Sequence, residues 1–193
     1  MSIRQRLYPN PENEMVLVRH CSDSRFVYNL GLEQRKFYRS DRVTKINTAT
    51  QMRELTEARK SFSWLAEGSS SVQQAALRDL DRAFQNWWKN PGHFSHPTWR
   101  KAGLNEGFCV RDLSVRKLNR KWGEVLVPKA GWVRFRLSRP WAEIEASIAE
   151  PKRISKYPDS AVRPGGAGDL SAKRGGERDA LRPLASLLVG RTL

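Results

Sequence analysis

Apolar side chains recur at helical spacing through most of the first ninety residues. Their pattern predicts a helix that begins at Pro11, a second over residues 23–39, a third over 48–60 and a fourth over 71–89. Side-chain oxygens precede each helix, where they can accept hydrogen bonds from free backbone N–H groups. The expected N-cap residues are Asn10, Asp23, Asn47 or Thr48, and Ser70 or Ser71.

The predicted helix over 23–39 has two faces of different character. At about 100° per residue, Phe26, Leu30 and Phe37 fall together, and we expect this side to face a core. The opposite side gathers basic residues around a tyrosine: Arg25, Tyr28, Arg35 and Arg39. That side either contacts nucleic acid or meets the acidic residues Glu54 and Glu57 of the third helix.

The helix over 71–89 is strongly amphipathic. Trp87 and Trp88 fall on its apolar side, so we expect both rings in the core rather than on a binding surface. The turn-rich link before this helix carries Phe62 and Trp64 as expected aromatic anchors.

After residue 91 the period changes from helical to alternating. Val133, Phe135 and Leu137 alternate with Arg134 and Arg136, which indicates a half-buried strand with a cationic outer face. Similar short runs follow residue 107, and Gly123 and Gly131 mark the expected turns. A short strand is also expected at the start, where Ile3 and Leu7 interleave with Arg4 and Arg6.

The predicted fold class is therefore α+β, with a short N-terminal strand, four helices and a small antiparallel β-barrel or sheet. We divide the chain into a first strand (1–10), a helical region (11–90), a β region (91–140) and a tail (141–193). The tail is rich in Arg, Gly and Pro, which predicts low order, with a short helix possible at about 178–189.

The large positive net charge of the sequence limits the kinds of partner that we expect. The 193 residues carry a formal net charge of +15 and include seven tryptophans, a composition that favours a nucleic-acid partner over an anionic membrane. Basic residues are densest over 111–139, where nine of them stand against Asp112 and Glu124. Lysine and arginine follow phosphates, and aromatic rings stack on bases.

Catalytic and metal-binding motifs are not found in the sequence. It contains no GxxxxGK[ST], GxGxxG, GxSxG or HExxH. His93, His96 and Cys109 could be imagined as metal ligands, but the fourth ligand and the usual spacing are missing. We expect no cofactor, no small-molecule substrate, no membrane span and a cytoplasmic location.

Four ordered stretches resemble the OrfB/TnpB proteins of bacterial insertion sequences. They are RLYPNPENEMVL with DSRFVYNLGLEQR, SSSVQQAALRDLDRAFQNWWK, FSHPTWRKAGLNEGFCV and VLVPKAGWVRFRLSRP. Together they cover residues 1 to about 140, the N-terminal part of that family, whose start is often described as the helix-turn-helix domain of a transposase.

The resemblance implies a wedge-like β-barrel interrupted by a helical recognition insert. In the family these parts hold guide RNA and the guide–target duplex, and a later RuvC-like domain with an inserted zinc ribbon cuts DNA. The family's G-[IV]-D-x-G segment and its CxxC pairs do not occur here. No catalytic residue therefore carries over, and the composition break near 141–151 is where a frameshift or early stop would leave its mark.

The sequence supports three functions. The first is a nucleic-acid-binding N-terminal fragment of a TnpB-like protein, with structured guide-type RNA or DNA as partners and no nuclease activity. The alternatives are a stand-alone helix-turn-helix DNA-binding regulator and a non-functional truncated product. The candidate nucleic-acid-binding residues are Arg4, Arg6, Arg25, Tyr28, Arg35, Arg39, Arg100, Lys101, Arg116, Lys117, Arg120, Lys121, Arg134 and Arg136.

Overall fold

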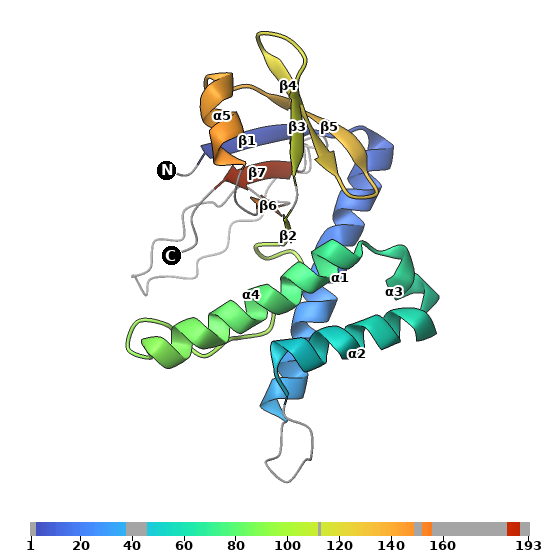
Figure 1. Cartoon of the computed structure of the whole chain (residues 1–193), viewed down its shortest axis with the longest axis vertical. Coiled ribbons are helices and arrows are strands. Elements are labelled where there is room, and N and C mark those ends of the chain that lie inside the picture. The colour runs from blue at the N-terminus through green and yellow to red at the C-terminus, as the bar shows by residue number, and fades with distance from the viewer. Residues whose placement is uncertain (1–2, 38–45, 112, 149–151, 156–184, 190–193) are drawn as a thin grey trace, which may run out of the picture.

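The computed structural model describes residues 3–37, 46–111, 113–148, 152–155 and 185–189. They form the predicted α+β fold, in which a group of helices lies beside an antiparallel sheet (Figure 1). The helices are α1 (Pro11–Lys36), α2 (Thr48–Ser61), α3 (Ser63–Glu67), α4 (Ser70–Lys89) and α5 (Trp141–Ser147).

Two of the predicted helix starts are confirmed. The Asn10 side chain accepts a 2.7 Å hydrogen bond from the Asn13 backbone N–H, with Pro11 in the first turn. Asn47 begins α2 in a capping box with Thr50. The expected cap of α4 is wrong, because Ser69 holds that position and its side chain makes no capping bond.

The predicted helix boundary at Asp23 is also wrong, because α1 runs without a break for 26 residues. Asp23 is buried inside α1 and accepts a 3.2 Å hydrogen bond from the Gln73 side chain of α4. His20 donates to the Pro128 carbonyl oxygen at 2.7 Å, and Ser24 accepts from Arg100 at 3.1 Å. These polar side chains bond across the fold, so they do not end the helix.

The predicted orientation of the 23–39 segment is reversed. Val27 and Leu32 are buried, whereas Phe26, Leu30 and Phe37 leave 43%, 38% and 65% of their surfaces exposed. Helical spacing separates the two faces of α1 but does not say which one meets the other helices.

Gly31 explains which face turns inward. A Cβ atom at this position would lie 2.9 Å from methyl carbons of both Leu77 and Leu80 of α4. Any larger residue here would displace these leucine methyl groups, so Gly31 favours the close packing of this side of α1 against α4.

Within the described residues, seven strands form one sheet in the order β2-β6-β7-β1-β5-β4-β3, and every neighbouring pair is antiparallel. The strand bounds are β1 (Ile3–Tyr8), β2 (Gly107–Val110), β3 (Ser114–Lys117), β4 (Trp122–Val127), β5 (Gly131–Arg136), β6 (Lys152–Ser155) and β7 (Ala185–Val189). Strand β1 pairs with β5, and Leu7 of β1 lies opposite Phe135 of β5. Gly123 lies within β4 under the Phe135 ring and not in a turn, which corrects that prediction.

Parts of the predicted tail have regular structure. Residues 141–147 form α5, and β6 and β7 belong to the sheet. The helix expected at about 178–189 is wrong for residues 185–189, which pair with β1 as a strand, and its earlier part lies outside the described residues. The prediction of low order for 156–184 and 190–193 likewise falls outside them.

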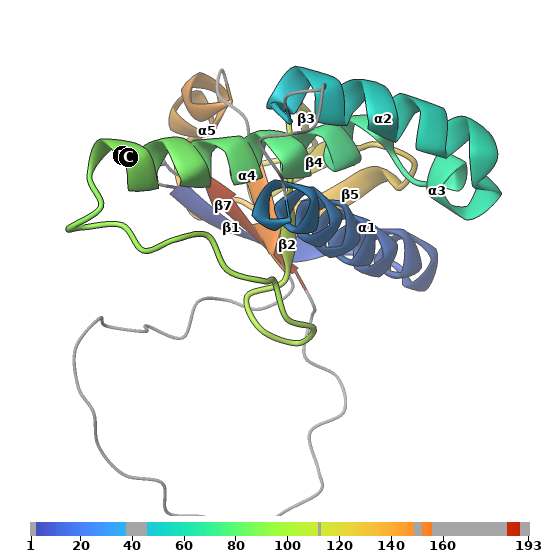
Figure 2. The ribbon, with the colours of Figure 1, turned by 90° about the horizontal axis from the view of Figure 1, so that it is seen from below.

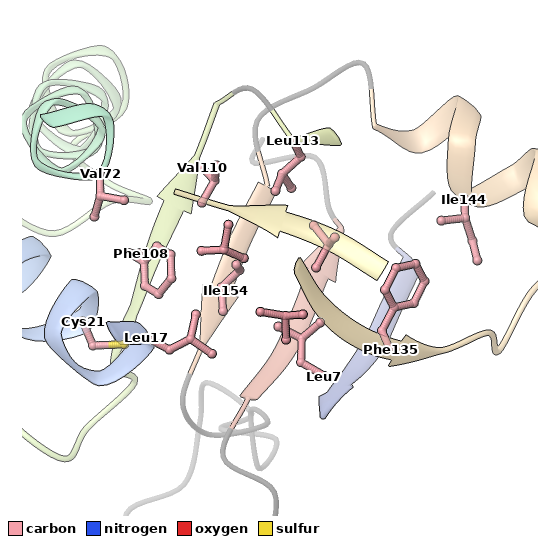
Figure 3. Close-up of a cluster of buried hydrophobic side chains, with 13 residues drawn as sticks. Leu7, Leu17, Cys21, Val72, Phe108, Val110, Leu113, Phe135, Ile144 and Ile154 are labelled. Atoms are coloured by element: carbon pink, nitrogen blue, oxygen red, sulfur yellow. The ribbon is translucent and has the colours of Figure 1, made fainter. Parts of the chain in front are cut away.

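Buried apolar side chains form two clusters. The first fills the inner face of the sheet and is closed by Leu17 and Cys21 of α1 and Val72 of α4 (Figure 3). The second lies between the helices and is made of Val27, Tyr28, Leu32, Leu55, Leu65, Ala76, Leu77, Leu80 and Phe84. Because α1 contributes to both clusters, it fixes the helices to the sheet.

The aromatic residues near α3 and α4 pack only in part as predicted. Trp87 lies against the second cluster, but Trp88 leaves 62% of its surface exposed. Phe62 and Trp64 are not anchors, since both are exposed and the neighbouring Leu65 is the buried residue.

Candidate nucleic-acid interface

The outer surface of strands β1, β5, β4 and β3 collects the cations predicted for the sheet. Paired residues on neighbouring antiparallel strands point to the same face. Tyr8 lies opposite Arg134, Arg134 opposite Glu124, and Glu124 opposite Arg116. We call this surface the cationic sheet face; its residues are Arg6, Tyr8, Ser114, Arg116, Trp122, Glu124, Leu126, Trp132, Arg134 and Arg136.

Arginines and aromatic rings touch one another on this face. The Arg116 guanidinium carbon lies 4.2 Å from the Trp132 ring centroid, and that of Arg6 lies 5.7 Å from the Tyr8 ring. Tyr8 in turn packs edge-on against Trp122, with 5.2 Å between ring centroids. Planar cations beside aromatic rings form a surface on which bases can stack while phosphates are neutralised.

Glu124 holds two of the arginines in place. Arg116 donates to its carboxylate from Nε at 2.9 Å and from Nη2 at 2.6 Å, and Arg134 Nε lies 3.4 Å away. The hydrogen bond from Arg116, with a smaller contribution from Arg134, lowers the pKa of the Glu124 carboxyl. The Glu124 side chain is 9% exposed, but the side chains of Arg116 and Arg134 are 53% and 68% exposed, so both arginines can still meet a ligand.

Three further cations surround the end of the β3–β4 hairpin. Lys117, Arg120 and Lys121 are all exposed. The Asn119 side-chain oxygen accepts hydrogen bonds from the backbone N–H groups of Lys121 and Trp122, at 2.9 and 3.0 Å. This turn therefore has a fixed shape, with its charges directed to solvent.

Arg35 of α1 is placed differently, inside the helical group. Its guanidinium pairs with Asp81 at 2.9 Å and also bonds Thr48 and Gln51 at 3.0 Å. It lies 5.0 Å from the Phe84 ring centroid, and its side chain is 8% exposed. Arg35 thus joins α1 to α2 and α4, and the acid that it meets is Asp81 rather than the expected Glu54 or Glu57.

Tyr28 and Arg100 also bond within the protein. The Arg100 guanidinium carbon lies 3.9 Å from the Tyr28 ring centroid, and its Nη2 pairs with Asp79 at 3.2 Å. Burial raises the pKa of the Tyr28 hydroxyl, and the ring is 6% exposed. Arg25 pairs with Glu106. These contacts tie the segment before β2 to α1 and α4.

The remaining candidates are less defined. Lys101 is exposed beside Arg100. Arg4 lies in β1 opposite Leu188 of β7. Arg39 lies outside the described residues.

The candidate residues predicted from the sequence do not include three aromatic residues of the cationic sheet face: Tyr8, Trp122 and Trp132. The same alternation that predicts Arg134 and Arg136 on the outer face of β5 also places Trp132 there, two residues earlier. Tyr8 and Trp122 could not be assigned in this way, because their contact depends on the pairing of β1, β5 and β4.

The described part of the chain contains no group of three or more His, Cys, Asp or Glu side chains placed to hold a metal ion. His96 packs instead against Trp87 and Phe84, and the Cys109 sulfur lies 3.6 Å from a carboxylate oxygen of Asp79. None of the described helices has the length and hydrophobicity needed to cross a bilayer.

Comparison with known proteins shows a similarity to one family over the N-terminal segment. Residues 1–42 match the model of the OrfB/IS605 helix-turn-helix domain family. The described part of that segment consists of β1 and the single continuous helix α1.

The similarity to one relative covers more of the chain than this N-terminal match. The protein of Escherichia coli (strain K12) named "Putative RNA-guided DNA endonuclease InsQ" is 26% identical over 154 residues. The alignment covers 79% of this chain but 37% of that protein, so the chain spans little more than a third of the relative's length. The predicted resemblance to OrfB/TnpB proteins is confirmed.

Proposed function

We propose that this chain binds nucleic acid through the cationic sheet face, with structured guide-type RNA and DNA as its partners. The observation that carries the proposal is the interleaving of exposed arginines with Tyr8, Trp122 and Trp132 on one face of four strands. The similarity to a protein named as an RNA-guided DNA endonuclease supports the same class of partner.

In this proposal the chain corresponds to the N-terminal part of a transposon-encoded TnpB-like protein. Residues 1–10 and 91–140 supply a wedge-like β region, and residues 11–90 supply the helical recognition region. The 193 residues do not contain the G-[IV]-D-x-G segment of the resembled family, so we expect no nuclease activity from them.

Arg25, Tyr28, Arg35 and Arg100 are not assigned to the interface. Their side chains are bound by partners within the protein, and phosphate contact would require breaking those bonds. The proposed interface consists instead of the cationic sheet face with Lys117, Arg120 and Lys121, while Arg4 and Lys101 stay predictions from the sequence.

The match to a helix-turn-helix family favours a second candidate, a sequence-specific DNA-binding regulator. The uninterrupted α1 argues against it, because a helix-turn-helix motif needs a turn between two helices, and residues 11–36 contain none.

Binding assays over a range of salt concentrations distinguish the two functions. The protein is purified at high salt and titrated with a structured RNA, a single-stranded RNA and several DNA duplexes. We expect RNA binding that weakens steeply with salt, little preference among duplexes, and no cleavage with Mg²⁺. Affinity for one duplex sequence, with no response to structured RNA, would support the regulator instead.

A further inference from the structure

The exposed side of α1 carries a continuous stripe of residues spaced three or four apart, in a pattern that repeats after eleven residues. The positions are Met15, Arg19, Ser22, Phe26, Leu30, Glu33 and Phe37, separated by four, three, four, four, three and four residues. At 100° per residue all seven fall within about 80° of the helix circumference. We call them the α1 stripe.

The apolar members of the α1 stripe are large and open to solvent. Met15 and Phe37 leave 69% and 65% of their surfaces exposed, and Phe26 and Leu30 leave 43% and 38%. Trp64 packs edge-on against Phe26, with 5.1 Å between ring centroids, and widens the apolar surface. In Figure 2, α2 and α4 both lie on one side of α1, the side of its buried residues. Exposed apolar stripes of this kind mark interaction sites.

The order of residues in the stripe is complementary to itself in the antiparallel direction. A two-fold axis through Phe26 places Met15 opposite Phe37 of a second copy, because the two positions average to 26. It also places Arg19 opposite Glu33 and Ser22 opposite Leu30, while Phe26 meets its own copy. The parallel arrangement would set Arg19 against Arg19 and Glu33 against Glu33, which repel each other.

We propose that the α1 stripe is a self-association surface, through which two copies of this chain pair antiparallel about Phe26. Each copy then contributes the same surface, as a closed two-fold interface requires. Two Arg19–Glu33 ion pairs flank the central aromatic contact, and Met15 packs on Phe37 at both ends.

Arg19 already has hydrogen-bond partners within its own chain. These contacts leave other N–H groups of its guanidinium for an ion pair with Glu33 of a second copy. Its Nη2 bonds the Glu67 carboxylate at 2.7 Å and the Trp64 carbonyl oxygen at 3.0 Å. Both bonds use the same nitrogen, and a guanidinium has five N–H donors. The Arg19 and Glu67 side chains are 42% and 62% exposed, so this surface pair holds Arg19 only weakly.

The test is the mass of the full chain in solution, measured by sedimentation over a range of protein concentrations. About 0.5 M salt is used, because a net charge of +15 on each copy opposes association at low ionic strength. We expect the mass to rise from 22.2 kDa toward twice that value as concentration increases. A mass that stays at 22.2 kDa at every concentration the protein tolerates would overturn the proposal.

Charge reversal tests the register. Arg19→Glu and Glu33→Arg should each weaken association at least tenfold, and the double variant should restore it, because the exchanged charges again face each other. Leu30→Glu should abolish association, whereas Leu104→Glu, at an exposed leucine outside the stripe, should not. Thermal unfolding confirms that each variant is folded. Association that survives Leu30→Glu, or a double variant that is not restored, would contradict the antiparallel pairing.

Discussion

Arg35 and Arg134 carry the same guanidinium group in opposite surroundings. Arg35 is 8% exposed and bonds Asp81, Thr48 and Gln51, so its charge is used within the helical group. The Arg134 side chain is 68% exposed, and a single 3.4 Å contact with Glu124 orients it. The sequence predicts both as binding residues, because nothing local to Arg35 reveals its partner Asp81, which is 46 residues away.

Replacing Arg35 therefore tests a structural role. Arg35→Ala should lower the free energy of unfolding by about 2–4 kcal/mol, because it removes the ion-pair partner of Asp81 and opens a gap beside Phe84. Arg53→Ala, at an exposed position of α2, should change it by less than about 0.5 kcal/mol. Urea unfolding of both variants measures the difference, and equal effects would contradict the structural role.

His20 gives the fold a dependence on pH. The ring is buried between α1 and the β4–β5 turn, and this burial lowers the pKa of the imidazole below its ordinary value of 6.5. The unfolded chain then takes up a proton at a higher pH than the folded one. Stability that is present above about pH 6.5 is consequently lost as the pH falls through the folded pKa.

The variant His20→Gln removes this titration while keeping a donor for the Pro128 carbonyl oxygen. We expect it to be less stable by about 1–2 kcal/mol at pH 7, but with a weaker loss between pH 7 and 5. His93→Gln, at an exposed histidine, is the matched control and should change the free energy of unfolding at pH 7 by less than about 0.5 kcal/mol. Unfolding free energies at several pH values provide the measurement, and an unchanged profile in His20→Gln would refute the assignment.

Among the elements, the junction of α3 and α4 depends on Gly68. A Cβ atom there would collide with the Asp23 carboxylate of α1 and the Gln73 amide of α4, which bond each other. Arg59 of α2 donates to the Gly68 carbonyl oxygen at 3.2 Å and to that of Ala66 at 3.0 Å. Three helices therefore meet around one backbone segment.

Gly68→Ala should accordingly destabilise the protein by about 1–3 kcal/mol, since buried polar groups would have to separate. Gly92→Ala is the matched control, because a Cβ atom there has its nearest neighbour at 3.9 Å. Thermal unfolding of the two variants compares them. Equal midpoints would show that the junction can relax around the added methyl group.

The elements also show what the sequence could predict. Periodicity located α2 and α4, the cap at Asn47 located the start of α2, and alternation located β5, because these signals are local. The continuity of α1 was missed, since Asp23 and Ser24 resemble a helix start unless their partners Gln73 and Arg100 are known. Likewise β7 was missed, because its strand conformation follows from pairing with β1, where Arg6 lies opposite Ser186, 180 residues later in the chain.

At the scale of the whole molecule, α1 extends from the sheet into the helical group (Figure 1). It places Leu17 and Cys21 in the first hydrophobic cluster and Val27 and Leu32 in the second. The cationic sheet face uses the side of the sheet opposite to the first cluster, so binding there leaves both clusters intact. The alternation of arginines with apolar residues in β5 could be predicted from the sequence. The position of these arginines beside Tyr8 and Trp122 could not, because it depends on the pairing of β5 with β1 and β4.

The central claim is tested by the salt dependence of RNA binding in two variants of equal net charge. Arg134→Ala with Arg136→Ala removes two cations from the cationic sheet face, and Arg53→Ala with Lys60→Ala removes two from exposed positions of α2. The plot of log affinity against log salt should lose about 1–2 units of slope in the first variant, with affinity at least about tenfold weaker. The second variant should bind like the wild type. Equal losses in both variants, or none in the first, would contradict an interface on this face.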